Sequence, residues 1–285
     1  MTHAWQSYNL KLTCRFVVPG DVPVLAEPGR TPYDLNFRLL GFRVRVHPFF
    51  WIGAGLLGGS LLEGPNSSFS AWLIWIAVVF VSIIVHELGH AIAFRRFGRN
   101  ASIVLYAFGG LAVPDSVVGG RTRRILVSLA GPFAGFVLAA LVYGSDQLTH
   151  WGSENGELVR FLYRQLFNVN LYWGIFNLLP VFPLDGGQVA SELCEARWPA
   201  RGFRISLQIS IWVAAAIAVY SLVCVYELQT QQFQVLKVLP WWFPPGSVYM
   251  GILFLILAVQ SYQLLQQIGR GMYYEAPDDR TPWER

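Results

Sequence analysis

Charged residues are scarce in this chain of 285 residues: Asp, Glu, Lys and Arg together make up 13% of it, against 54% hydrophobic residues. Because soluble domains have about 25% charged residues, this composition excludes an ordinary water-soluble globular protein. The mean hydropathy of +0.43 agrees. The sequence therefore predicts an integral membrane protein that crosses the bilayer several times.

Cysteine is also scarce, and a basic surface is absent. The three cysteines, Cys14, Cys194 and Cys224, form no CxxC pair, so no disulfide framework is expected. The net charge of +4 comes from arginines in short segments between apolar runs, as the positive-inside rule describes. Since no basic stripe is interleaved with aromatic residues, nucleic acid is excluded as a partner.

The apolar runs divide the chain into three parts. Residues 1–46 are predicted to be a polar cytoplasmic segment, in which residues 10–18 and 42–46 alternate as strands do. Residues 47–268 are predicted to form the membrane domain and residues 269–285 a polar cytoplasmic tail. About six transmembrane helices would place most Lys and Arg residues, and both termini, on the cytoplasmic side. The expected spans are residues 48–62, 71–94, 125–143, 161–182, 205–226 and 248–266.

A short segment between the second and third spans does not fit a membrane helix. Residues 101–119 are interrupted by Gly109, Gly110 and Pro114 and are too short to cross twice. We expect a small re-entrant or membrane-associated β-hairpin with the glycine pair at its bend; an ordinary cytosolic hairpin is the alternative. The predicted fold class is thus an all-α polytopic membrane protein with one such hairpin.

Residues 71–94 carry ionisable groups inside an apolar run long enough to cross a bilayer. Ionisable side chains such as His86, Glu87 and His90 each cost several kcal/mol at that depth of the bilayer, so a function is expected for them. His86 and His90 are four residues apart and share one helix face, where both can bind one Zn²⁺. Glu87 is then placed to take a proton from water at that ion.

Two histidines do not complete a catalytic zinc site, which uses three protein ligands and leaves a fourth position for water. Asp185 is the candidate for the third ligand, because the predicted topology brings it to the cytosolic half of the membrane that also holds His86 and His90. Pro180 and Pro183 are expected to break the preceding span, leaving Asp185 in a Gly-flanked turn.

Two motifs in this order resemble a known family. HELGH at residues 86–90 and the pattern N-x-x-P-x-x-P-L-D-G-G at residues 177–187 resemble the site-2 protease type of intramembrane zinc metalloprotease, peptidase family M50. The resemblance covers about residues 43–190, with the zinc-motif core at residues 71–190. It implies a zinc-dependent endopeptidase with one Zn²⁺ per chain that hydrolyses peptide bonds within transmembrane segments of membrane proteins.

The resemblance also implies roles for individual residues. His86, His90 and Asp185 would bind zinc, and Glu87 would be the catalytic base. Asn177 would hold the substrate or stabilise the oxyanion, with a helix–helix hydrogen bond as an equal alternative. Gly109 and Gly110 would offer a strand edge to an unwound substrate. The expected partners are transmembrane substrates and the lipid bilayer, in a bacterial cytoplasmic membrane.

Two other functions stay open. A polytopic metal-ion transporter would use His and Asp residues between helices but would not need Glu87. A catalytically inactive relative would only bind membrane proteins. The sequence does not indicate an oligomeric state.

Overall fold

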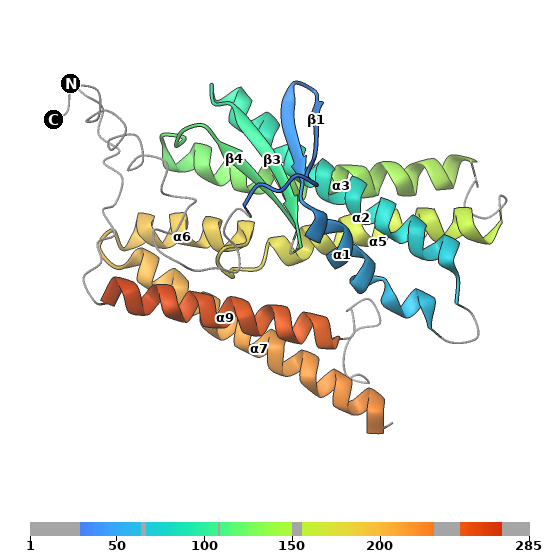
Figure 1. The fold of residues 1–285 in the computed structure, drawn as a ribbon. Coiled ribbons are helices and arrows are strands. Elements are labelled where there is room, and N and C mark those ends of the chain that lie inside the picture. Colours follow the sequence, from blue (N-terminus) through green and yellow to red (C-terminus); the bar gives the residue numbers. More distant parts are fainter. Residues whose placement is uncertain (1–28, 64–66, 108, 150–155, 231–245, 270–285) are drawn as a thin grey trace. The chain divides into compact units, whose positions relative to one another are not determined.

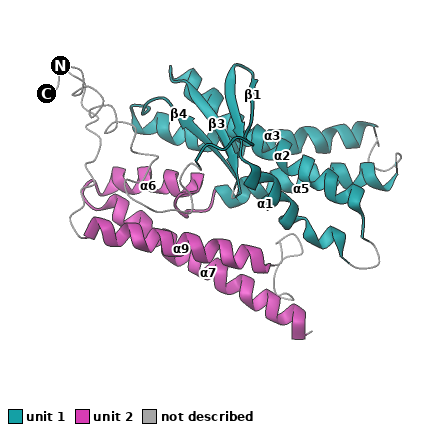
Figure 2. Cartoon of the chain, viewed as in Figure 1, with its two compact units in different colours: residues 1–177 teal, residues 178–285 magenta. Residues whose placement is uncertain are grey.

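The computed structural model describes residues 29–63, 67–107, 109–149, 156–230 and 246–269. The strand expected at residues 10–18 and nearly all of the C-terminal tail lie outside these residues. The chain forms two compact units, residues 1–177 and 178–285, which are coloured in Figure 2 and described separately below.

The first unit contains four strands and most of the helices (Figure 1). Its elements are β1 (Leu35–Leu39), β2 (Phe42–Val46), α1 (Pro48–Leu57), the 3₁₀ helix η1 (Gly59–Leu62), α2 (Phe69–Arg96), β3 (Ala101–Tyr106), β4 (Gly109–Pro114), α3 (Arg121–Thr149) and α5 (Glu157–Asn177).

The four strands form one sheet in the order β1-β2-β3-β4. The β1–β2 and β3–β4 pairs are antiparallel, whereas β2 and β3 are parallel because α1 and α2 intervene between them. The alternation at residues 42–46 is confirmed as a strand whose Phe42, Val44 and Val46 enter the core. The hairpin expected between the second and third spans is present, but it is half of this larger sheet.

Helix α2 forms the centre of the first unit. The Ser68 side chain caps its N-terminus by accepting a hydrogen bond from the Ala71 N–H. Arg95 and Arg96 lie in its last turn, where their positive charges interact favourably with the helix dipole. Gly98 follows with a φ of +75°, a conformation that commonly ends a helix. The helix packs against α3, α5, β3 and β4, so its residues face several neighbours at once.

Four of the described helices are long and apolar enough to cross a membrane: α2, α3, α7 (Gly202–Thr230) and α9 (Val248–Gly269). The protein is therefore an integral membrane protein, mostly helical, with a small sheet. The first expected span is shorter than predicted, since α1 has 10 residues and reaches only about 15 Å. The fourth, α5, has 21 residues but begins with polar and charged ones and is not among the four.

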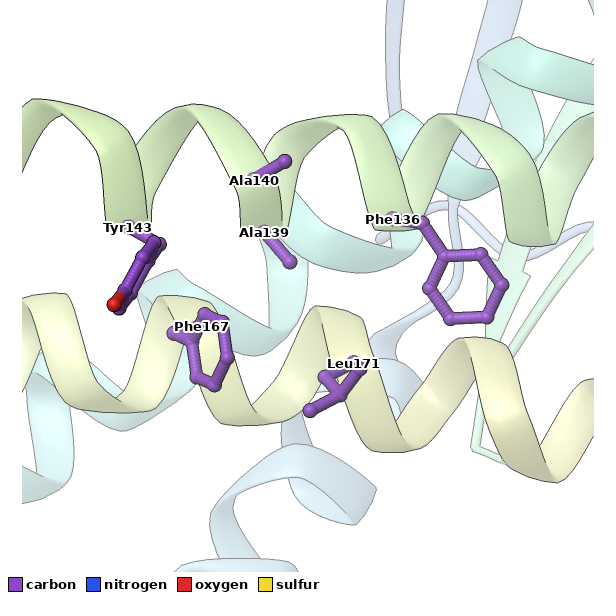
Figure 3. A pocket seen from close by; sticks show the side chains of 6 residues that line it. All are labelled: Phe136, Ala139, Ala140, Tyr143, Phe167 and Leu171. Atoms are coloured by element: carbon purple, nitrogen blue, oxygen red, sulfur yellow. The ribbon is translucent and has the colours of Figure 1, made fainter.

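An apolar cavity of about 330 Å³ lies between α3 and α5 (Figure 3). Phe136 and Tyr143 of α3 and Phe167 and Leu171 of α5 contribute most of its wall. Its lining has almost no polar atoms, as expected for side chains at the depth of the acyl chains.

The second unit consists of α6 (Asp185–Arg197), α7 and α9. α7 packs against both α6 and α9. The expected fourth span was too long at its C-terminal end: α5 stops at Asn177, three residues before Pro180, because a proline restricts the residues that precede it. The prediction that Asp185 lies in a turn was also wrong, because Asp185 is the first residue of α6.

Candidate metal centre

His86 and His90 lie on the same face of α2 and point toward each other. Their Nε2 atoms are 3.2 Å apart, and both side chains are buried. Two nitrogens bound to one tetrahedral Zn²⁺, each at about 2.0–2.1 Å, would be ~3.3 Å apart. The pair is therefore spaced to hold a single ion.

The proton positions on His90 suit metal binding. Its Nδ1 is 2.8 Å from the Val127 carbonyl oxygen of α3. Because a carbonyl can only accept, Nδ1 carries the proton in the neutral ring and Nε2 keeps its lone pair for a metal. A main-chain oxygen on the neighbouring helix thus fixes both the tautomer and the direction of this ligand.

Helix α3 leaves space in front of the two rings because residue 131 is glycine. A Cβ atom at Gly131 would lie 2.8 Å from His86 Nε2 and 2.5 Å from Cε1 of His90. It would therefore occupy the place where an ion must sit. The spacing Gly131-x-x-x-Gly135 suits close packing between helices; Gly131 also opens the metal cradle.

Glu87 is buried next to the histidines and touches the start of β4. A Cβ atom at Gly110 would lie 2.6 Å from Oε1 of Glu87, so only a glycine allows this close approach of strand and carboxylate. Burial, and to a smaller extent the Glu87 charge, raise the pKa of Tyr106 to about 12. The Tyr106 hydroxyl on β3, which is neutral at physiological pH even with the ordinary pKa of 10, therefore stays neutral further into the alkaline range.

Trp173 of α5 closes another side of this region. Its ring stands edge-on to His86, with the centroids 6.5 Å apart. A Cβ atom at Gly109, whose φ is +135°, would lie 3.1 Å from Cζ2 of that indole. Gly109 and Gly110 thus begin β4 directly between Trp173 and Glu87, rather than forming the bend of the hairpin, which lies between Tyr106 and Gly109.

Asn177, the third substrate-binding candidate, is the last residue of α5. Its Nδ2 donates a hydrogen bond to the Trp173 carbonyl oxygen at 2.8 Å, within the same helix. This bond is neither of the two alternatives expected for it, and the role of Asn177 in binding substrate stays a prediction.

The sequence analysis overlooked a polar contact one helical turn before His86. Asn170 of α5 is 2% exposed and donates from Nδ2 to Ser82 Oγ of α2 at 2.9 Å. A hydrogen bond between the side chains of two packed helices fixes their register. The signal was present in the sequence, as an asparagine within a predicted span and a serine four residues before His86, but nothing local pairs the two.

Asp185 belongs to the second unit, where the preceding main chain is held in place. The Phe182 N–H donates to Ser210 Oγ of α7 at 3.0 Å, and Ser261 Oγ of α9 donates to the Phe182 carbonyl oxygen at 3.3 Å. A Cβ atom at Gly186 would lie 2.5 Å from a carbonyl oxygen of the loop that precedes α6. The glycines after Asp185 therefore let this loop pack closely against α6. This packing fixes the position of the Asp185 main chain, from which the carboxylate extends.

Comparison with known proteins gives a family match. Residues 147–220, from the end of α3 into α7, match the model of peptidase family M50. The match covers about a quarter of the chain, and in that part the chain resembles this family. The matched residues include the proline and Asp-Gly-Gly motif, and the resemblance inferred from the two motifs is confirmed.

Curated relatives of the chain include zinc metalloprotease MJ0392 of Methanocaldococcus jannaschii, 27% identical over 188 residues, a match covering 65% of this chain and 52% of that protein. Stage IV sporulation protein FB of Bacillus subtilis is 28% identical over 173 residues, covering 59% and 54%. The chain thus spans about half the length of these relatives.

A solved structure shares the fold of this chain. The site-2 protease from Methanocaldococcus jannaschii superposes with a TM-score of 0.52 at 22% identity, covering 86% of this chain and 98% of that one. At this level of identity the likeness concerns the fold alone.

Proposed function

We propose that this protein is a zinc-dependent intramembrane endopeptidase of the site-2 protease type, which hydrolyses peptide bonds within transmembrane segments of other membrane proteins. The observation that carries the proposal is the pair of Nε2 atoms 3.2 Å apart, with a buried carboxylate on the adjacent residue, inside a membrane-spanning helix. A transporter or a simple binding protein has no need of that carboxylate.

His86, His90 and Asp185 are proposed to hold one Zn²⁺. All three are buried, and each offers one ligand atom of a type that zinc binds. The space in front of Gly131 and the hydrogen bond from His90 to Val127 support the two histidines. For Asp185, the support is the fixed start of α6 and the match of its motif to the family.

Bound zinc would supply a Lewis acid that polarises a peptide carbonyl and makes water more acidic. Glu87 is proposed to accept the proton of the attacking water and to deliver a proton to the leaving amine. Its neighbour Gly110 supports this role, because a side chain at that position would occupy the space of the carboxylate.

Substrate is proposed to bind along β4. This strand is last in the sheet order, so among the described residues one of its edges has no strand partner. A transmembrane helix must unwind to expose its carbonyls, and an added strand would satisfy the freed backbone groups. Since Gly110 of β4 touches Glu87, the added strand would pass close to the catalytic carboxylate.

We also propose that six segments cross a bacterial cytoplasmic membrane, with both termini in the cytoplasm. α5, with 21 residues, would reach about 31 Å, and α1 with η1 about 23 Å. The membrane domain would then cover residues 47–268. To test this topology, single cysteines are placed before α1 and after α5, and their accessibility to a membrane-impermeant reagent is measured.

The substitution Glu87→Gln tests the function. The full chain is reconstituted with single-span membrane proteins, and cleavage and bound zinc are measured in parallel. We expect cleavage to fall by about 10²–10⁴-fold, because a general base contributes that much, while zinc stays bound. Glu157→Gln is the matched control, since Glu157 is exposed at the start of α5 and loses the same charge.

Each alternative function gives a different result. Unchanged ion transport by Glu87→Gln, with no cleavage by wild type, would establish a transporter. If wild type and Glu87→Gln both bind the single-span proteins and neither cleaves them, the protein is a catalytically inactive relative. Cleavage that survives both Glu87→Gln and a zinc chelator would contradict the proposal directly.

A further inference from the structure

Two exposed arginines face each other across the β1–β2 hairpin. The strand register pairs Arg38 with Arg43, and both side chains are exposed. Among the described residues, neither forms an ion pair. Like charges directly opposite each other destabilise an antiparallel pair. The hairpin thus holds two positive charges together that no described carboxylate neutralises.

The turn between these strands carries an exposed leucine in an unfavourable conformation. Leu40 has a φ of +51° and Gly41 a φ of +87°, so this two-residue turn is of the kind that prefers Asn-Gly. The Leu40 side chain is 63% exposed. Asparagine would adopt this backbone conformation more easily, and its polar side chain would be better suited to exposure to water. A strained, exposed leucine at this position therefore indicates a function.

The hairpin is attached to the end of α2 that lies at the membrane surface. Arg95 donates from Nη1 to the Leu40 carbonyl oxygen at 2.9 Å, and its guanidinium lies 4.4 Å from the centre of the Phe42 ring. α2 has 28 residues, which reach about 42 Å, longer than the ~30 Å hydrocarbon core. Arg95, one residue from its end, therefore lies at headgroup depth, and so does Leu40.

We propose that the hairpin tip, made of Arg38, Leu40 and Arg43 with Arg95 beside it, binds the headgroups of anionic phospholipids. The arginines would contact the phosphates, and Leu40 would enter the boundary between headgroups and acyl chains. Figure 1 shows this hairpin, in blue, projecting from the helices of the first unit. This surface carries positive charge and an exposed apolar side chain, and it lies at the depth of the lipid headgroups.

Hydrogen exchange measured by mass spectrometry on the full chain in lipid nanodiscs tests the proposal. Nanodiscs of phosphatidylcholine alone are compared with nanodiscs that also contain phosphatidylglycerol. We expect exchange of residues 35–46 to slow by about tenfold or more with phosphatidylglycerol. The double variant Arg38→Gln/Arg43→Gln should lose this protection. Equal exchange in the two lipids for wild type, or full protection in the double variant, would overturn the proposal.

Matched variants separate the lipid from other sources of negative charge. Arg160→Gln/Arg164→Gln removes the same charge from exposed positions on α5 and should keep the protection; if it abolishes protection, net charge rather than the hairpin is responsible.

Leu40→Asn preserves the turn and should reduce the protection by phosphatidylglycerol. If inorganic phosphate protects residues 35–46 as well as the lipid does, and Leu40→Asn changes nothing, the site binds a free anion and the lipid assignment is wrong. Glu87→Gln should be protected like wild type, since lipid binding is independent of catalysis.

Discussion

Replacing Gly131 by alanine should strongly weaken metal binding without disrupting the fold. The added Cβ would lie 2.5 Å from Cε1 of His90 and 2.8 Å from Nε2 of His86, whereas ordinary contact begins at 3.4 Å. The His86 ring must therefore move by about 0.6 Å and the His90 ring, whose Nε2 is closer still, by at least about 0.9 Å. Metal–ligand distances tolerate only about 0.2 Å. The hydrogen bond from His90 to Val127 opposes the movement, because it holds the ring from the other side.

The expected loss of affinity follows from this displacement. Removing a partner that only orients a ligand weakens metal binding by about 10–100-fold. Gly131→Ala displaces two ligands and also fills the space of the ion, so we expect at least a ~100-fold loss, which corresponds to about 2.7 kcal/mol. Zinc content measured by mass spectrometry after dialysis against graded zinc buffers gives the value.

Gly144→Ala on the same helix is the control. A Cβ at Gly144 has nothing within 4 Å, so this variant should keep its zinc; replacing glycine by alanine within a helix should also stabilise it by up to about 1 kcal/mol. A Gly131→Ala protein that binds one zinc per chain with wild-type affinity would refute the assignment of the cradle.

Two further predictions concern stability. Hydrogen bonds from Thr31 and the charge of Arg45 lower the pKa of Asp34 from 3.8 to about 2; a lowered pKa stabilises the fold above about pH 4 and loses that contribution as the pH falls through about 2. Asp34→Asn should therefore flatten the pH dependence of the melting temperature across this window, and an unchanged acid profile would contradict the pairing. Asn170→Ala should lower the free energy of unfolding by about 0.5–2 kcal/mol, since it removes the buried hydrogen bond from α5 to Ser82 of α2; in a double-mutant cycle with Ser82→Ala, simple additivity would show that the bond contributes nothing.

The sequence by itself determined the features that depend on local periodicity. Four residues are about one helical turn, so the spacing of His86 and His90 places both imidazoles on one face of α2 wherever the helix lies. The length of the apolar runs likewise identified α2, α3, α7 and α9 as membrane helices. The strand at residues 42–46 followed from alternation of the same local kind.

Only the tertiary structure decided which distant segments meet. The parallel pairing of β2 with β3 joins residues more than 50 positions apart, and no local pattern specifies that register. The contacts of Gly131 with the two histidines and of Gly110 with Glu87 are invisible in the sequence, because a glycine shows no sign of what approaches it. Helix period fixes the direction of a side chain, but the space in front of it depends on packing between helices and strands.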